Sequence, residues 1–160
     1  MKLNIETETI EFKLLTSQLN RAIESLGAML NKQGYGKVLF GVKDDGTVVG
    51  QEIGNKTLKD ISEAISQKIK PAVVPTIFPI IYDDKIVLSV EVKGFNKPYM
   101  ANGLYLIRSG LENKKIEPEI LRDIVFLNSS ETITSIESFN KDLTFNQLKQ
   151  LFIIKGLSVN

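Results

Sequence analysis

The sequence contains no cysteine and no histidine. The absence of cysteine excludes disulfides, thiolate chemistry and cysteine-based zinc sites, and the absence of histidine removes the other usual zinc ligand. Any hydrolytic chemistry would therefore use Asp, Glu, Lys, Tyr or Ser side chains. Any metal would be a Mg²⁺ or Mn²⁺ ion bound by oxygen ligands.

Long apolar runs are also missing. The most apolar uncharged run, PAVVPTIFPIIY at residues 71–82, is too short and too rich in proline to span a bilayer. Residues 1–12 lack the uninterrupted apolar region of a signal peptide. We therefore expect a cytoplasmic protein that has no membrane partner.

The chain is long enough to fold without disulfides. Of its 160 residues, 42% are hydrophobic and 24% are charged, which is typical of one globular domain. Such a domain buries roughly two thirds of its unfolded surface. The net charge of +1 neither indicates nor excludes a nucleic-acid partner, so the distribution of charge along the chain matters more than the sum.

Apolar residues at helical spacing predict three helices. We expect them at about residues 17–34, 55–70 and 117–130. Pro71 would end the second helix. The third helix would place four apolar side chains in the core: Ile120, Leu121, Ile124 and Val125.

Strands are predicted between these helices from β-branched and aromatic content and from turn residues. They are expected at residues 8–15, in a hairpin at 37–50 around the turn DDGT, in a hairpin at 76–94 around Asp83 and Asp84, and at 103–110. Strands thus outnumber helices and come as hairpins. The pattern predicts an α+β fold, with a mostly antiparallel or mixed β-sheet and helices packed on it.

The last part of the sequence differs in composition. Residues 129–142, SSETITSIESFNKD, are polar and weakly patterned, which is typical of a linker. The domain would then occupy residues 1–128. Residues 143–160 begin an amphipathic segment with no partner for its apolar face. We expect this segment to start a C-terminal region and the sequence to be the N-terminal part of a longer polypeptide.

Positive charge is concentrated between Lys93 and Lys115. This stretch has a single acid, Glu112, and its aromatic residues include Phe95. A cationic stretch with aromatic residues suits contacts with phosphates and bases. The alternative is a pair of strands with solvated lysines. The candidate binding residues are Lys93, Lys97, Tyr99, Tyr105, Arg108, Lys114 and Lys115.

Four short blocks in a fixed order carry a family resemblance. They are ETETIEFK, NKQGYGKVLFGVKDDGTVVG, KIKPAVVP and KPYMANGLYLIRSG. Together they resemble the Schlafen AlbA-like domain family, over about residues 3–128. The matching positions are Glu6, Glu11, Phe12, Lys13, Asn31, Gly34, Gly41, Val42, Asp44, Asp45, Gly46, Val49, Gly50, Pro71, Arg108 and Gly110. The family has a double glycine where this chain has Gly34 and Tyr35, with Gly36 one position later.

The resemblance implies a DNA-binding domain of a bacterial transcriptional regulator. The lysines and the arginine of the cationic stretch would then contact phosphates, and Tyr99 or Tyr105 would stack on a base. DNA is the expected partner rather than RNA, and no cofactor is implied. A third hypothesis is a protein-interaction module that forms a homo-oligomer through an exposed strand edge.

The same resemblance also implies a nuclease alternative. In animal Schlafen proteins the related domain is an endoribonuclease, and its carboxylates match Glu6, Glu11 and Asp44, with Asp45 as the other candidate aspartate. These residues would hold Mg²⁺ or Mn²⁺, with Lys13 beside Glu11 on the same strand face. Glu6 and Glu11 are an odd number of residues apart, so a shared site requires Glu6 to precede the strand or a bulge to lie between them.

Each of these residues also has a structural alternative. Glu6 would serve at a sheet edge to keep it soluble. Glu11 and Lys13 would form an ion pair, and the two aspartates would form a turn.

Overall fold

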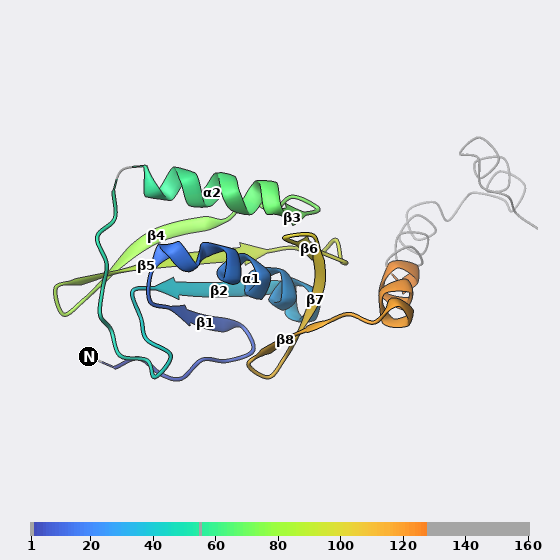
Figure 1. Ribbon diagram of the computed structural model, residues 1–160, viewed down its shortest axis with the longest axis horizontal. Coiled ribbons are helices and arrows are strands. Elements are labelled where there is room, and N and C mark those ends of the chain that lie inside the picture. Colours follow the sequence, from blue (N-terminus) through green and yellow to red (C-terminus); the bar gives the residue numbers. More distant parts are fainter. Residues whose placement is uncertain (1, 55, 128–160) are drawn as a thin grey trace, which may run out of the picture. The chain divides into compact units, whose positions relative to one another are not determined.

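The computed structural model describes residues 2–54 and 56–127. The chain divides into two units, Met1–Val125 and Phe126–Asn160. The predicted linker at 129–142 and the predicted C-terminal region at 143–160 lie outside the described residues. The first unit contains two four-stranded sheets and the helices α1 and α2 (Figure 1), which confirms the predicted α+β fold.

The first sheet is mixed and has the strand order β1-β2-β5-β4. Strand β1 (Ile10–Lys13) runs parallel to β2 (Tyr35–Phe40). Strands β5 (Lys85–Lys93) and β4 (Thr76–Tyr82) continue the sheet in antiparallel pairing. The turn between β4 and β5 is the one predicted at Asp83 and Asp84, which both have positive φ angles, as a tight hairpin turn requires.

Both α-helices cover one face of this sheet. A 3₁₀ turn, η1 (Thr16–Gln18), leads into α1 (Leu19–Gln33), which connects the parallel strands β1 and β2; α2 (Thr57–Lys68) follows β2. Gly34 ends α1 with a left-handed φ of 72°. The core between the helices and the sheet includes Ala22, Ile23, Leu26, Leu30, Val38, Phe40, Ile61, Ile65, Leu88, Val90 and Val92.

The opposite face is covered in part by the segment after β2. Val42 and Val48 pack there with Phe12, Leu39 and Val87 in a second apolar cluster. The hairpin predicted at 37–50 is wrong in its second half, because residues 42 and 48 form only an isolated bridge. After residue 48 the chain runs beside the start of β5, where the N–H of Gln51 donates to the backbone oxygen of Ile86.

The second sheet has the order β3-β6-β7-β8. Its strands are β3 (Ile69–Lys70), β6 (Met100–Ala101), β7 (Leu104–Ser109) and β8 (Glu112–Lys115). Only β7 was predicted, at 103–110. Helix α2 is shorter than predicted, because Ile69 is already extended and starts β3.

One further prediction needs correction. Residues 118–127 form a helix within the described part of the chain, but Ile120 and Val125 keep 50% and 48% of their surface exposed, so the predicted core contacts are wrong for these two. Gly36, the glycine that follows Tyr35, allows β2 to pack closely against α1. A Cβ at Gly36 would lie 2.9 Å from the Cβ of Met29 on α1.

No helix among the described residues is both long and apolar enough to cross a membrane.

Candidate functional site

Glu11, in the middle of β1, is held between two cations. Its Oε2 accepts a 2.5 Å hydrogen bond from Nη2 of Arg108 on β7, and its Oε1 accepts one of the same length from Nζ of Lys13. The Arg108 side chain is 1% exposed, and the side chains of Glu11 and Lys13 are each 12% exposed. The ion pair of Glu11 and Arg108 therefore joins β1 of the first sheet to β7 of the second through a contact that is almost fully buried.

The contact continues into α1 and β8. Nη1 of Arg108 donates to Oδ1 of Asn113 at 2.8 Å, and Nδ2 of Asn113 donates to Oγ of Ser25 at 2.9 Å. Nε of Arg108 is buried without a hydrogen-bond partner. This chain of polar contacts links four elements, so Arg108 acts as an interior support and has no surface to offer to a ligand.

Glu6 lies before β1, which is one of the two arrangements under which Glu6 and Glu11 could share a site. Its Oε1 accepts the backbone N–H of Phe12 at 2.7 Å. Burial raises the pKa of the Glu6 carboxyl above its usual value, and the negative charges of Glu11 and Asp44 raise it further, against the lowering effects of that hydrogen bond and of Lys13. Glu11 and Asp44 thus lie near enough to Glu6 to raise the pKa of its carboxyl.

These carboxylates do not fit a metal ion in the observed arrangement. Both oxygens of Glu11 are engaged by cations, and Asp44 lies exposed in a turn. Across residues 2–54 and 56–127, no group of three or more Asp or Glu side chains is arranged to hold a metal ion. The neighbouring Asp45 accepts the N–H and the hydroxyl of Thr47, which confirms the turn interpretation for this aspartate.

Asn31 holds the second sheet against the end of α1. Its Nδ2 donates to the backbone oxygens of Tyr99 at 2.8 Å and of Leu106 at 2.7 Å, and its Oδ1 accepts the N–H of Tyr99 at 2.6 Å. Asn31 is 3% exposed. One side chain thereby fixes the cationic segment at two points.

The cationic segment presents only part of the predicted set to solvent. Lys93, Tyr105, Lys114 and Lys115 are exposed and Lys97 is partly exposed, whereas Tyr99 and Arg108 are 2% and 1% exposed. The hydroxyl of Tyr99 accepts the N–H of Asn96 inside the fold. The structure therefore brings five of the seven candidates to the surface and places two in the interior.

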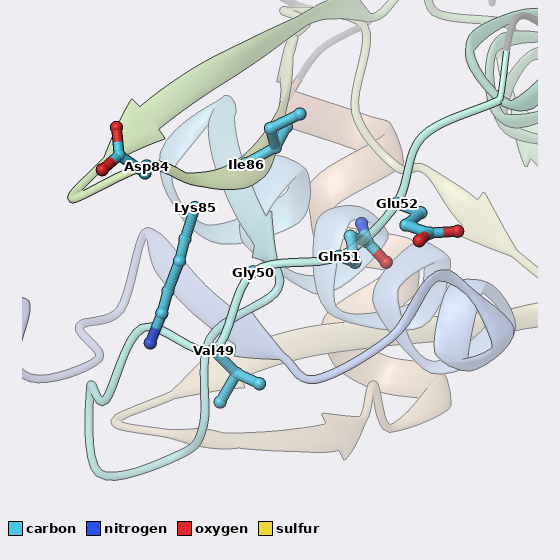
Figure 2. Close-up of a pocket in the computed structure, with 7 residues that line it drawn as sticks. All are labelled: Val49, Gly50, Gln51, Glu52, Asp84, Lys85 and Ile86. Atoms are coloured by element: carbon cyan, nitrogen blue, oxygen red, sulfur yellow. The ribbon is translucent and has the colours of Figure 1, made fainter.

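A shallow hollow of about 360 Å³ lies beside the β4–β5 turn (Figure 2). None of the predicted site residues lines it. Gln51 closes one side, and its Oε1 accepts the N–H of Thr16 at 3.2 Å. The lining residues are Val49, Gly50, Gln51, Glu52, Asp84, Lys85 and Ile86.

Comparison with known proteins decides the family. Residues 6–117 match the family described as Schlafen, AlbA_2. The chain belongs to this family. The Schlafen AlbA_2 family connects the domain with nucleic-acid association in general terms. No curated protein matches the chain significantly.

A solved structure shares the fold of this Schlafen AlbA_2 domain. The DIP2311 protein from Corynebacterium diphtheriae is similar with a TM-score of 0.58 at 16% identity, over 73% of this chain and 24% of that one. The chain thus spans about a quarter of that protein. The N-terminal domain of an ATP-dependent DNA helicase RecG-related protein from Nitrosomonas europaea aligns at 22% identity with a TM-score of 0.49, over 71% of this chain and 87% of that one.

Several residues that build this polar network were missed from the sequence. Ser25 and Asn113 were not singled out, although Ser25 lies on the apolar face of α1 between Ala22 and Leu26 and so had to find a buried partner. Asn31 was recognised by its motif, but its role as a clamp was not. No sequence signal pointed to Asn113, because its partners come from distant elements.

Proposed function

We propose that this domain binds nucleic acid through the exposed part of its cationic segment. Lys93, Lys97, Lys114 and Lys115 contact phosphates in this proposal, and Tyr105 lies among them. The observation that supports it most is that four lysines of one segment reach the surface while its one arginine is neutralised internally by Glu11. Membership of the Schlafen AlbA_2 family agrees with this partner.

Strand pairing supports a common surface for two of these groups, Tyr105 and Lys114. Tyr105 pairs with Met100 of β6, and its backbone oxygen accepts the N–H of Ile116, directly after Lys115. Lys114 lies opposite Ile107, which shares its strand face with Tyr105 because side chains alternate along a strand. Tyr105 and Lys114 therefore lie on the same outward face of β7 and β8.

The acids near this surface are few or already engaged. Glu112 lies 3.9 Å from Lys114, and both side chains are more than half exposed, so this pair contributes little and yields readily to a phosphate. Glu8 accepts from the N–H of Gly110 and from Gln33. The surface therefore keeps a positive excess that attracts a polyanion.

Lysine replacements test this proposal. Lys93→Gln and Lys115→Gln should each weaken binding of a short labelled DNA and lower the slope of log affinity against log salt by about one, because each removes one phosphate contact. Lys59→Gln is the matched control, since Lys59 lies exposed on α2 and pairs only weakly with Glu63 at 3.6 Å. Equal slopes for all three variants and the wild type would contradict the proposal.

We also propose that the partner is DNA rather than RNA, that the domain belongs to a transcriptional regulator, and that the protein works in the cytoplasm. Parallel titrations with DNA and RNA of one sequence test the first point. Tighter binding of the RNA would overturn it.

A second candidate function is that of a protein-interaction module that self-associates through an exposed strand edge. Strand β4 is the last strand in its sheet, and Ile81 on it is 72% exposed. A second copy pairing along β4 would bury that edge. Light scattering at increasing protein concentration tests this, and a constant monomer mass would exclude it.

A further inference from the structure

Phe95 is the most exposed aromatic residue in the described part of the chain. Its exposed fraction is 86%, compared with 36% for Tyr105 and 2% for Tyr99. A phenyl ring left in water has a higher free energy than one buried in an apolar environment, and it contributes little packing to the fold. The ring is therefore available to a partner that the described residues do not supply.

The loop that carries Phe95 is anchored on both sides. Before it, the N–H of Gly94 donates to the backbone oxygen of Gly34 at 2.9 Å. After it, the N–H of Asn96 donates to the hydroxyl of Tyr99 at 3.0 Å, and Tyr99 is itself clamped by Asn31. The exposed ring is thus displayed by a tethered loop.

Close packing at Gly94 shows how tightly this loop is fitted. A Cβ at Gly94 would lie 2.2 Å from the hydroxyl oxygen of Tyr99, so no larger residue fits there without moving that ring. The buried Tyr99, one of the two tyrosines predicted to stack on a base, instead packs against Gly94 and accepts the N–H of Asn96, the two residues that flank Phe95.

Cationic side chains lie on both sides of the ring along the chain. Lys93 precedes Phe95 by two residues, and its Nζ lies 5.9 Å from the centre of the Tyr35 ring. Lys97 follows by two residues, and its Nζ donates to the backbone oxygen of Lys32 at 3.2 Å, which brings Lys32 at the end of α1 to the same loop. An exposed aromatic face among ammonium groups matches the chemistry of a nucleobase and its flanking phosphates.

We infer that Phe95 stacks on an unpaired base, so that the domain binds single-stranded nucleic acid in preference to duplex. This inference rests on the proposed nucleic-acid binding and adds the form of the ligand and the residue that selects it. Bases within a duplex are already stacked on one another and present no free face to a protruding ring. Backbone phosphates alone would not distinguish the two forms in this way.

Three replacements at Phe95 test the inference by fluorescence anisotropy. Phe95→Ala and Phe95→Leu should weaken binding of a short single strand by about 5-fold to 150-fold, while Phe95→Trp should retain or strengthen it, because stacking needs a π face and not only apolar area. Affinity for duplex of the same sequence should change little. DNA and RNA strands are titrated separately to identify the sugar.

The controls distinguish a failure of this inference from a failure of the proposed nucleic-acid binding. Val74→Ala removes an apolar side chain that is 88% exposed between β3 and β4 and should leave binding unchanged. Thermal melts confirm that each variant is folded. If the wild type binds no strand at low salt, the proposed function fails and the inference fails with it. If the wild type binds with the expected salt dependence but Phe95→Leu binds single strands as well as it does, only the inference is overturned.

Discussion

Arg108 and Glu11 form the most buried ion pair of the described residues, and both belong to motifs that suggested surface chemistry. Two charges in a nearly dry environment stabilise a fold only as a pair, because either one left alone is strongly unfavourable. Their 2.5 Å contact joins the two sheets. The Glu11 carboxylate therefore stabilises the fold, and the candidate binding groups are the exposed residues between Lys93 and Lys115.

Replacing Glu11 should reveal this role directly. Glu11→Gln leaves Arg108 buried without a countercharge, and we expect the free energy of unfolding to fall by about 3 kcal/mol. Urea unfolding at neutral pH measures the change. Glu112→Gln is the control, since that carboxylate is 78% exposed and should matter by less than about 0.5 kcal/mol. Equal midpoints for the two variants would show that the buried pair does not support the fold.

Glu6 should make stability depend on pH. Its pKa is raised in the folded protein, mainly by burial, so in the pH range between the unfolded and folded pKa values the native state binds more protons than the unfolded state. Stability should then fall as pH rises through that range, which starts at about 4.3 for an unperturbed Glu. Glu6→Gln should remove this loss while the amide oxygen still accepts the Phe12 N–H.

The measurement is urea unfolding of wild type and Glu6→Gln across pH. The variant should gain stability relative to the wild type as pH increases above about 4.3, and the difference should vanish below it. A difference that is constant with pH would mean that protonation of Glu6 is not linked to folding.

The secondary-structure elements separate what local sequence determines from what long-range contacts determine. The position of α1 follows from its apolar spacing and from Gly34, so it was predictable within a few residues. The sequence ENKK of β8 has no apolar alternation, and it becomes a strand only because it pairs with β7. The parallel pairing of β1 with β2 likewise depends on α1 packing across the sheet.

The candidate site shows the same division. The charge of the segment from Lys93 to Lys115 is visible in the sequence, and so is its order of aromatic residues. The burial of Tyr99 and Arg108 is not visible there, because it results from contacts with Asn31 and Glu11 that are far away along the chain. Charge and residue type predicted a binding surface in this segment, but packing determines which of the seven candidate residues are exposed on it.

Asn31 should control how firmly the cationic segment is attached to α1. Asn31→Ala removes three buried hydrogen bonds and leaves backbone groups of Tyr99 and Leu106 without partners, so we expect a loss of about 3 kcal/mol in the free energy of unfolding. Hydrogen exchange should show faster opening of residues 99–106 than of α1. Asn20→Ala, at an exposed position, is the control. Uniform acceleration across the whole domain would contradict a local clamp.

Considered as a whole, the described domain uses its charges in two ways. Interior charges join the sheets, as in the contact of Glu11 with Arg108 and Lys13, while the remaining lysines of one segment stay at the surface. The net charge of +1 conceals this separation. Nucleic-acid binding in this account depends on the local excess, so it should be sensitive to salt although the protein is nearly neutral.

The most direct test is a titration of labelled single strands and duplexes with the purified protein over a series of salt concentrations, with EDTA in one arm and Mn²⁺ in the other. The account predicts binding of intact strands in both arms, with log affinity falling linearly as log salt rises. No detectable binding at low ionic strength would contradict nucleic-acid binding. Cleavage that occurs only with Mn²⁺ would contradict the assignment of Glu11 to structural support.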